Sequence, residues 1–504
     1  MSDADQATFE KLCDYVKETA LLQSVQSLVE WDQQTLMPEQ AGEYRAEQIM
    51  HLAGLVHQRN TAARLGDWLG ELAESPLASD PHSDTGATIR ELKRTFDKES
   101  KVPQSLVEAL AQASSLGQQA WIQARKNGDF ASFQPQLQKI INLKRQQALA
   151  VGYDECPYDA LLDDYEPGAK TSQVAGVLES LRKGLVPLVA AISESRRRPD
   201  EGILTRHYPA ADQEVFGKAA AAAIGFDFTR GRLDVTAHPF CCGVGPRDCR
   251  ITTRYDERFF SSAFFGILHE AGHGIYDQGL RDDWYGLPPG KDVSLGIHES
   301  QSRLWENFVG RSREFWEHFY PPAQQRFTAL RDVSLDDFYF AINAVKPSLI
   351  RVEADEATYN LHIIIRFELE QALINDDFNV ADLPAAWNEK YQKYLGIQPP
   401  SDTHGVLQDV HWSAALIGYF PTYSLGNLYA AQFFAKADQE LGGLQALFAQ
   451  GEFAPLKEWL GRNIHRRGQC YAAEDLGKLV TGEALSHEPL VRHLRAKLEP
   501  LYGI

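Results

Sequence analysis

Helical periodicity is the feature that most constrains the fold of this chain. In the stretch Phe9–Val29, apolar residues recur near one face of a helix while mostly polar residues fill the rest. Similar patterns predict further helices over Thr88–Lys98, Gln104–Lys126, Phe133–Val151, Gln173–Ser195, Asp212–Ile224, Phe259–Gln278, Leu295–Arg311, Pro321–Arg331, Leu335–Ala344, Ile350–Asp376, Leu383–Tyr394, Leu425–Gly442 and much of Glu452–Tyr502.

Strand signals are few. Gly231–Ala237 and Arg250–Tyr255 contain β-favouring residues between turn-forming ones, which predicts a small β-ribbon inserted among helices. We see no internal repeat and no Gly/Ser-rich linker. The sequence therefore predicts an all-α fold with a central groove between two helical lobes. We expect one domain over residues 1–504, with an N-terminal lobe over about 1–200 and a catalytic region over about 201–504.

The net charge of −19 bears on possible partners. A negative field of this size repels phosphate backbones and anionic lipids, which argues against nucleic acid and membrane surfaces. Two explanations of the acidity stay open. The carboxylates can serve solubility alone, or some of them can surround a bound cation.

Six cysteines in 504 residues argue against a disulfide framework. Cys241, Cys242 and Cys249 lie close enough in sequence to be considered as a metal clip, but no CxxC or His pair accompanies them, which favours reduced structural thiols. The acidic first residues do not resemble a signal peptide, and no run of about 18 apolar residues occurs. We expect a cytoplasmic protein.

The most informative segment is His269-Glu270-Ala271-Gly272-His273, which lies inside a predicted helix. Residues four apart share a helix face, so both imidazoles can bind one zinc ion. Glu270 then flanks the metal and can take a proton from a water that the metal activates. The small residues Ala271 and Gly272 leave room for another element to pack close. The alternative is a pair of core histidines with ordinary hydrogen bonds.

A catalytic zinc site needs a third protein ligand, and Glu299 is the candidate, 26 residues after His273. A glutamate near the start of a helix that also carries Trp305 and Phe308 needs a cationic partner if it is buried. Otherwise it is a solvated carboxylate favoured by the helix dipole. Asp277 follows His273 by four positions and could orient a ligand imidazole, or be solvated.

At this point the chain resembles the carboxypeptidase Taq family of metallocarboxypeptidases. Beyond the zinc motif, the matches are His238-Pro239-Phe240 for HPF, Asp248-Cys249-Arg250-Ile251-Thr252 for DxRxT, Ile350–Asp355 for IRxxAD and Gly405–Trp412 for GxxQDxHW. Segments around Trp31–Pro38 and Tyr158–Leu162 also look like family segments. The resemblance covers essentially the whole chain.

The resemblance implies removal of single C-terminal residues from peptides, with broad side-chain tolerance and poor cleavage next to proline. It also implies a mostly helical fold with a deep groove, a zinc ion or sometimes cobalt, and a homodimer. The substrates would be peptides with a free C-terminus.

Such an enzyme must recognise a carboxylate, and arginine does so with two parallel hydrogen bonds. The candidates are Arg351 and Arg250. Arg351 could instead form an internal ion pair on its predicted helix, with Glu353 and Asp355 nearby. An internal role is equally open for Arg250 and its neighbour Arg254.

The tetrahedral oxyanion needs hydrogen-bond donors beside the metal. His411 is the first candidate, followed by Tyr423 and Tyr419, for which plain packing is an equal alternative. His238 precedes a proline, so it is expected in a loop, where it could contact substrate or serve structure alone.

The predicted mechanism follows from these roles. The metal is held by His269, His273 and Glu299, while Glu270 deprotonates the attacking water and passes the proton to the leaving amine. His411 and a tyrosine hold the oxyanion. Two rivals remain: an endo-acting zinc oligopeptidase, and a non-enzymatic helical scaffold with structural zinc or no metal.

Overall fold

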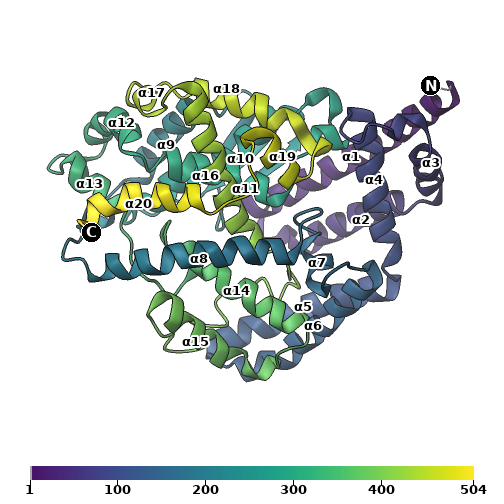
Figure 1. Cartoon of the computed structure of the whole chain (residues 1–504), viewed down its shortest axis with the longest axis horizontal. Coiled ribbons are helices and arrows are strands. Elements are labelled where there is room, and N and C mark those ends of the chain that lie inside the picture. The colour runs from purple at the N-terminus through teal and green to yellow at the C-terminus, as the bar shows by residue number, and fades with distance from the viewer. Residues whose placement is uncertain (1–2) are drawn as a thin grey trace. The chain divides into compact units, whose positions relative to one another are not determined.

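The structure is a computed structural model that describes residues 3–504. Its twenty α-helices (Figure 1) span Asp3–Thr35 (α1), Gly42–Asn60 (α2), Ala63–Ala73 (α3), Asp84–Lys101 (α4), Gln104–Asn127 (α5), Phe130–Val151 (α6), Pro157–Leu162 (α7), Thr171–Glu194 (α8), Ala210–Ile224 (α9), Phe260–Gly279 (α10), Leu295–Arg303 (α11), Arg313–Arg326 (α12), Leu335–Ile342 (α13), Tyr359–Ile374 (α14), Leu383–Leu395 (α15), Pro421–Leu441 (α16), Gln445–Ala449 (α17), Ala454–Asn463 (α18), Ala473–Thr481 (α19) and Glu488–Tyr502 (α20).

The chain forms two compact units, each assembled from three separate segments. Unit 1 contains Met1–Glu99, Asp200–Ile342 and Phe433–Glu483, and unit 2 contains Ser100–Pro199, Asn343–Gln432 and Ala484–Ile504. These limits differ from the expected lobes, because residues 1–99 and 100–199 fall in different units. The single peptidase domain and its groove stay predictions.

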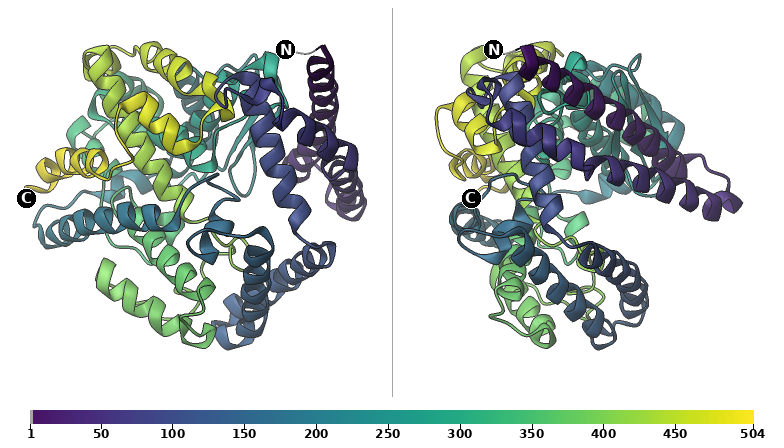
Figure 2. Two further views of the ribbon diagram at one scale, coloured as in Figure 1. Left: turned by 45° about the vertical axis from the view of Figure 1, so that its right-hand side comes forward. Right: turned by 90° about the vertical axis from the view of Figure 1, so that its right-hand side faces the viewer.

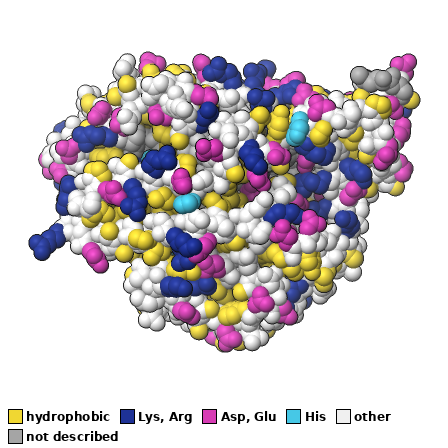
Figure 3. All heavy atoms as spheres, viewed as in Figure 1, with side chains coloured by type: hydrophobic (Ala, Val, Ile, Leu, Met, Phe, Trp, Pro, Cys, Tyr) yellow, Lys and Arg dark blue, Asp and Glu magenta, His cyan; other side chains and the backbone are white. Residues whose placement is uncertain are grey.

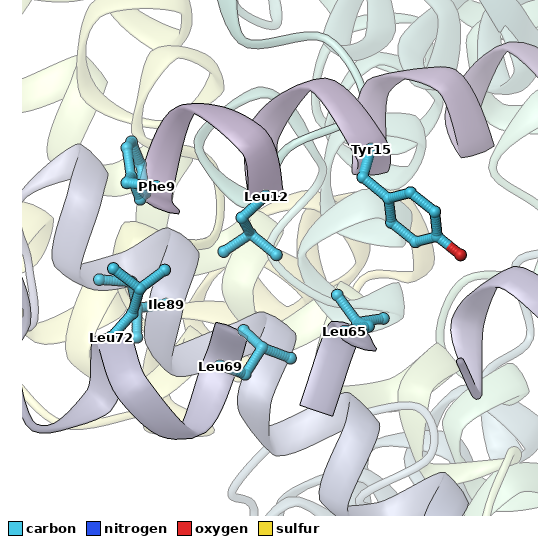
Figure 4. Close-up of a cluster of buried hydrophobic side chains, with 7 residues drawn as sticks. All are labelled: Phe9, Leu12, Tyr15, Leu65, Leu69, Leu72 and Ile89. Carbon is cyan, nitrogen blue, oxygen red and sulfur yellow. The ribbon is translucent and has the colours of Figure 1, made fainter. Parts of the chain in front are cut away.

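In unit 1, the first helices pack through a hydrophobic cluster. The helices α1 and α2 lie side by side (Figures 1 and 2), and the apolar face of α1 also meets α3 and α4. Figure 4 shows the side chains that fill this contact: Phe9, Leu12, Tyr15, Leu65, Leu69, Leu72 and Ile89. Burying a leucine or phenylalanine of this kind contributes about 1.5–3 kcal/mol to folding.

The small β element of unit 1 is a three-stranded sheet of Gly231–Val235 (β1), Cys241–Gly245 (β2) and Asp248–Thr253 (β3), in the order β1-β3-β2. β1 pairs with β3 in parallel and β2 pairs with β3 antiparallel. The sequence predicted β1 and most of β3. It missed β2, because Cys-Cys-Gly-Val-Gly lacks a run of β-favouring residues. Both β2 and β3 contact α10.

In unit 2, the long helices α5 and α6 form an antiparallel pair, and α8 contacts α14, α15 and α20 (Figures 1 and 2). The helix α6 begins at an N-cap, where the side chain of Asp129 accepts a hydrogen bond from the backbone N–H of Ser132. It ends before Gly152, whose φ of +87° favours glycine.

The helical fold class with one small sheet is confirmed, but individual helices differ. No helix was predicted where α2, α3 and α7 lie, and the expected helix Pro321–Arg331 is the second half of α12 followed by a 3-10 turn over Thr328–Leu330. The expected helix Ile350–Asp376 begins only at Tyr359, because the Asp355 carboxylate accepts hydrogen bonds from the backbone N–H groups of Ala357 and Thr358 and turns the chain there. The expected helix Leu295–Arg311 is α11 followed by one wide π-helical turn, Leu304–Val309 (η6).

Within residues 3–504, no helix is both long enough and apolar enough to span a membrane. On the face shown in Figure 3, acidic and basic side chains are interspersed. Local pairing of this kind softens the net negative charge over short distances.

Candidate functional site

The helix α10 carries His269, Glu270 and His273. Its first half is buried: Phe260, Phe264 and Phe265 are at most 4% exposed and pack among other aromatic rings. The period-3.6 spacing of these rings anchors one side of the helix. The two histidines, four residues apart, therefore present their rings together, with centroids 4.9 Å apart.

Three metal-ligating side chains converge at this helix. The Glu299 Oε2 atom of α11 lies 3.6 Å from His269 Nε2 and 3.4 Å from His273 Nε2. All three ligand atoms lie within 4.8 Å of one another. Ligands at about 2.0–2.2 Å from one tetrahedral ion are separated by about 3.3–3.6 Å, so the residues present fit a divalent metal such as zinc. The structure thus brings together the three residues predicted as ligands.

Glu299 is held in place by its own helix. Its Oε1 accepts a hydrogen bond from Arg303 Nε at 2.6 Å, and its Oε2 accepts one from Ser302 Oγ at 3.0 Å. Burial opposes ionisation of Glu299, but the Arg303 guanidinium holds the pKa of this carboxyl well below its usual range. Glu299 is therefore anionic, and because the residue is 7% exposed it is not the solvated carboxylate of the alternative interpretation.

Glu306 is a functional side chain that the sequence reasoning missed. Its Oε2 lies 2.8 Å from His269 Nδ1 and 3.3 Å from Arg303 Nη1. A carboxylate in this position fixes the ring orientation and leaves Nε2 as the ligating nitrogen. The available signal was spacing, because Glu306 follows Glu299 by seven residues, two helical turns. It lies in the π-helical turn η6, a feature common near functional sites.

His273 is oriented by backbone instead. Its Nδ1 lies 3.1 Å from the carbonyl oxygen of His298, and the rings of His273 and His298 stack with centroids 4.4 Å apart. Asp277, expected as a candidate to orient a ligand imidazole, pairs with His298, whose Nε2 lies 3.0 Å from Asp277 Oδ1. Burial disfavours the charged ring, but Asp277 raises the pKa of His298 to about 9.

Glu270 lies between the two ligand histidines in sequence and is 7% exposed. Burial raises the pKa of Glu270 to about 7. A carboxyl group with a pKa near neutrality can both accept and return a proton, which is what a general base requires. Burial also lowers the pKa of His273 to about 4, so this imidazole is neutral and able to ligate.

In unit 2, Arg351 is paired within the chain. Its Nε and Nη2 atoms donate to Asp409 Oδ1 at 3.0 and 2.9 Å, and Nη1 donates to the Tyr359 hydroxyl at 2.9 Å. The residue is 5% exposed and lies in a short 3-10 turn, Arg351–Glu353 (η8), instead of the expected helix. The internal ion pair is therefore formed, but with Asp409 and not with Glu353 or Asp355.

Three further predicted residues gather around Arg351 in unit 2. The Tyr423 hydroxyl lies 3.5 Å from His411 Nε2, and the rings of His411 and Tyr419 have centroids 5.4 Å apart. The Arg351 guanidinium lies 5.2 Å from the centre of the Tyr423 ring. Burial lowers the pKa of His411 to about 4, so its ring is neutral and can donate one hydrogen bond.

The remaining candidates lie at the small sheet of unit 1. Arg250 of β3 donates to both oxygens of Asp248, at 2.9 and 2.8 Å, and lies over the Trp31 ring at 4.3 Å. Arg254 donates to the Ala237 carbonyl oxygen at 3.4 Å. His238 is exposed in the connection between β1 and β2, so the expected loop is confirmed.

Known proteins match this chain over nearly its whole length. Residues 11–498 match the family model described as carboxypeptidase Taq (M32) metallopeptidase. The curated "Thermostable carboxypeptidase 1" of Thermus thermophilus is 47% identical over 508 residues, covering 99% of each chain. "Carboxypeptidase 1" of Bacillus subtilis is 39% identical, covering 98% of this chain and 99% of that one. The crystal structure of an M32 carboxypeptidase from Deinococcus radiodurans superposes with a TM-score of 0.95 at 38% identity, covering 99% of this chain and 100% of that one.

Proposed function

The chain belongs to the carboxypeptidase Taq family of metallopeptidases and is a metallocarboxypeptidase, and from this premise we propose that it releases single C-terminal amino acids from peptides in a zinc-dependent reaction. The observation that carries the proposal is the convergence of His269, His273 and Glu299 beside Glu270. We further propose broad side-chain tolerance and poor cleavage next to proline, as the family resemblance implies. Because the chain belongs to a family of metallopeptidases, we no longer consider the non-enzymatic scaffold.

The metal of this family is a divalent ion, and we assign its ligands to His269, His273 and Glu299. Two neutral imidazoles and one carboxylate are the ligand set of hydrolytic zinc sites, in which one position stays open. Cobalt is the expected substitute. When bound there, the ion supplies Lewis-acid polarisation of the peptide carbonyl and lowers the pKa of water.

Glu270 is assigned the proton transfers. Its carboxylate accepts the proton of the attacking water and returns it to the nitrogen of the departing amino acid. The ligand imidazoles are held for this chemistry by Glu306 and by the backbone carbonyl of His298. His411, with Tyr423 or Tyr419, is assigned to donate hydrogen bonds to the oxyanion.

Arg351 is assigned to bind the terminal carboxylate of the substrate, with Arg250 as the second candidate. A guanidinium has five N–H donors on three nitrogens. In Arg351 each of these nitrogens already donates one hydrogen bond within the chain, which fixes the plane of the group. Arg250 likewise donates two hydrogen bonds to Asp248. His238 is assigned to contact the substrate from its exposed loop.

The Glu270→Gln variant tests the mechanism. Because the amide keeps the shape of the side chain but cannot accept a proton, metal content should stay near that of the parent while kcat falls by at least about a hundredfold. Metal analysis and turnover of a free-acid peptide are measured together. Normal turnover in this variant would refute the assignment.

Paired peptides test the exopeptidase action and the choice of arginine. Free-acid peptides should lose one residue at a time, while C-terminally amidated peptides should resist cleavage, and a chelator should abolish the reaction. Arg351→Ala should damage cleavage of free-acid peptides selectively, with Arg250→Ala as the matched comparison. Cleavage of amidated peptides at internal bonds would favour the endo-acting oligopeptidase.

We also propose a homodimer in the cytoplasm, with peptides bearing a free C-terminus as partners and no nucleic acid or membrane partner. The family resemblance supports the dimer. The six cysteines, all within the described residues, form no disulfide, which suits a reducing compartment. Sedimentation of the purified chain and fractionation of cells test these two points.

A further inference from the structure

A second cluster of metal-ligating side chains lies in unit 1, outside the set assigned to catalysis. It consists of Cys241 of β2, Cys249 of β3 and Asp277 of α10. In the sequence, Cys241 and Cys249 have no CxxC or His pair near them, so the sequence favours reduced structural thiols. The structure adds a carboxylate from a helix that contacts both strands.

The separations among the three ligand atoms match one shared ion. Cys241 Sγ lies 3.6 Å from Cys249 Sγ and 3.7 Å from Asp277 Oδ2, and Cys249 Sγ lies 3.9 Å from the same oxygen. Two thiolates at about 2.3 Å and one carboxylate oxygen at about 2.0–2.2 Å from a tetrahedral zinc ion are separated by about 3.5–3.8 Å. The two thiols and the carboxylate therefore already stand near ligand spacing.

The strands explain this arrangement. In the antiparallel register Gly243 is opposite Cys249, so Cys241 is the diagonal neighbour of Cys249 on the same face of the sheet. Gly243 also leaves room for the carboxylate, because a Cβ atom there would lie 3.1 Å from Asp277 Oδ2. Three elements thus fix the cluster, and no flexible loop supplies a ligand.

Burial and chemistry indicate the class of ion. Cys249 is 3% exposed, and Cys241 and Asp277 are only partly exposed, so the cluster is shielded from bulk water. Paired thiolates select soft or borderline ions such as Zn²⁺ and Cd²⁺ over Mg²⁺ or Ca²⁺. Binding would release the two thiol protons to solvent and leave three negative ligands around a divalent cation.

We propose that Cys241, Cys249 and Asp277 form a second binding site for a thiophilic divalent cation of the Zn²⁺ or Cd²⁺ class. The site is distinct from the catalytic ligand set but adjacent to it through His298, which bonds to Asp277 Oδ1 and stacks on His273. The three ligand atoms are held by the sheet and α10 whatever reaction the protein catalyses.

Cadmium titration of the metal-depleted full chain tests the site. The protein is kept reduced with a thiol-free phosphine, and bound cadmium is counted while the sulfur-to-metal charge-transfer absorption is recorded in the ultraviolet. The parent chain should bind two ions and show the sulfur band. Cys249→Ser should lose one ion and the band, and Cys241→Ser should do the same. The second variant is included because Cys249 is the more buried of the two, and its replacement could disturb folding.

Two matched variants complete the test. Cys242→Ser changes the adjacent thiol, whose Sγ lies 3.9 Å from the Ser27 carbonyl oxygen, and should keep both ions and the band. His269→Ala should lose the other ion and keep the band, which separates this site from the catalytic one. One bound ion without a sulfur band in the parent, or an unchanged band in both Cys249→Ser and Cys241→Ser, would overturn the proposal.

Discussion

At the scale of single residues, the candidate metal ligands are positioned by groups that never touch the metal. Glu299 is held by Arg303 and Ser302, and His269 is held by Glu306. Arg303 donates to both Glu299 and Glu306, so one guanidinium ties the two carboxylates together. Supporting partners of this kind raise ligand basicity and reduce the ordering cost of metal binding.

Changing Glu306 to Gln tests this support. The amide oxygen can still accept from His269 Nδ1, but the negative charge that balances Arg303 and the ring is lost. We expect metal affinity to fall by about 10- to 100-fold, measured by competition with a chromophoric chelator. Glu317→Gln, at an exposed position of α12, is the control and should leave the metal affinity unchanged. Parent-like affinity in Glu306→Gln would show that Glu306 does not position the ligand.

The sequence could predict the ligands but not these partners. The HExxH spacing places His269 and His273 on one helix face, and the apolar surroundings of Glu299 indicate a buried carboxylate. The bonds of Asp277 to His298, and of Arg351 to Asp409 58 residues away, depend on how separate segments meet. No local pattern encodes such contacts. The sequence therefore left open whether Asp277 orients a ligand imidazole or is solvated, and the structure pairs it with His298 instead.

At the scale of elements, the close crossing of α10 and α11 brings the histidines to Glu299. Gly272 lies where α11 passes, and a Cβ atom there would be 2.6 Å from both the Gln301 carbonyl oxygen and Ser302 Cα. This confirms that the small residues of the motif admit a neighbouring element. The start of α11 is fixed by Ser294, whose Oγ accepts from the Ile297 backbone N–H at 3.1 Å.

Replacing Gly272 with Ala should force the two helices apart. We expect a loss of about 1–3 kcal/mol in the free energy of unfolding, because the clash is with backbone that cannot rotate away. Metal affinity should fall as well, since Glu299 moves with α11. Urea unfolding and metal titration measure the two effects.

Gly266→Ala is the matched control on the same helix. Its Cβ would meet only Thr253 Oγ1, at 4.0 Å, so the substitution should be neutral or stabilise the helix by up to about 1 kcal/mol. Equal stability of the Gly272→Ala and Gly266→Ala proteins would contradict the close-crossing argument.

Periodicity predicted most helices, but it failed where a side chain interrupts the backbone pattern. The helix expected over Ile350–Asp376 breaks because Asp355 caps the chain ahead of α14. The Asp three residues before Thr358 was the available signal, and the apolar run that follows it concealed the break. The π-helical turn η6 contains one more residue per turn than an α-helix. The spacing of apolar residues along the sequence does not predict such a turn.

At the scale of the whole molecule, stability depends on buried charges far along the chain from the metal ligands. In unit 2, Glu356 lies 2.7 Å from Lys497 Nζ and 3.2 Å from His493 Nε2, both on α20. Burial opposes ionisation, but the Lys497 charge lowers the pKa of Glu356 from 4.5 to about 2. The folded state therefore binds this proton less readily than the unfolded state does.

The sign of the pH effect follows from that shift. The ion pair stabilises the fold fully above the unfolded pKa of about 4.5 and loses its contribution as the pH falls through about 2. A shift of this size corresponds to about 3 kcal/mol. Urea midpoints at several pH values should show Glu356→Gln less stable than the parent at neutral pH, with the gap closing between pH 4.5 and 2.

The control is Glu353→Gln, an exposed position three residues earlier, which should leave the pH profile unchanged. A constant gap between parent and Glu356→Gln across this range would show that the ion pair does not carry the acid sensitivity.

The interleaving of the two units bears on how the chain is made. Unit 1 needs residues 433–483 and unit 2 needs residues 484–504, although both begin within the first hundred or so residues. A growing chain therefore cannot finish unit 1 before residue 483, or unit 2 before residue 504, has left the ribosome. The cluster of α1, α3 and α4 can form early, because all its residues lie before residue 90, but the contacts with the last segments form only at the end, and long-range pairing of this kind is slow and prone to aggregation. Synthesis of this protein thus carries an extended window in which chaperones can act.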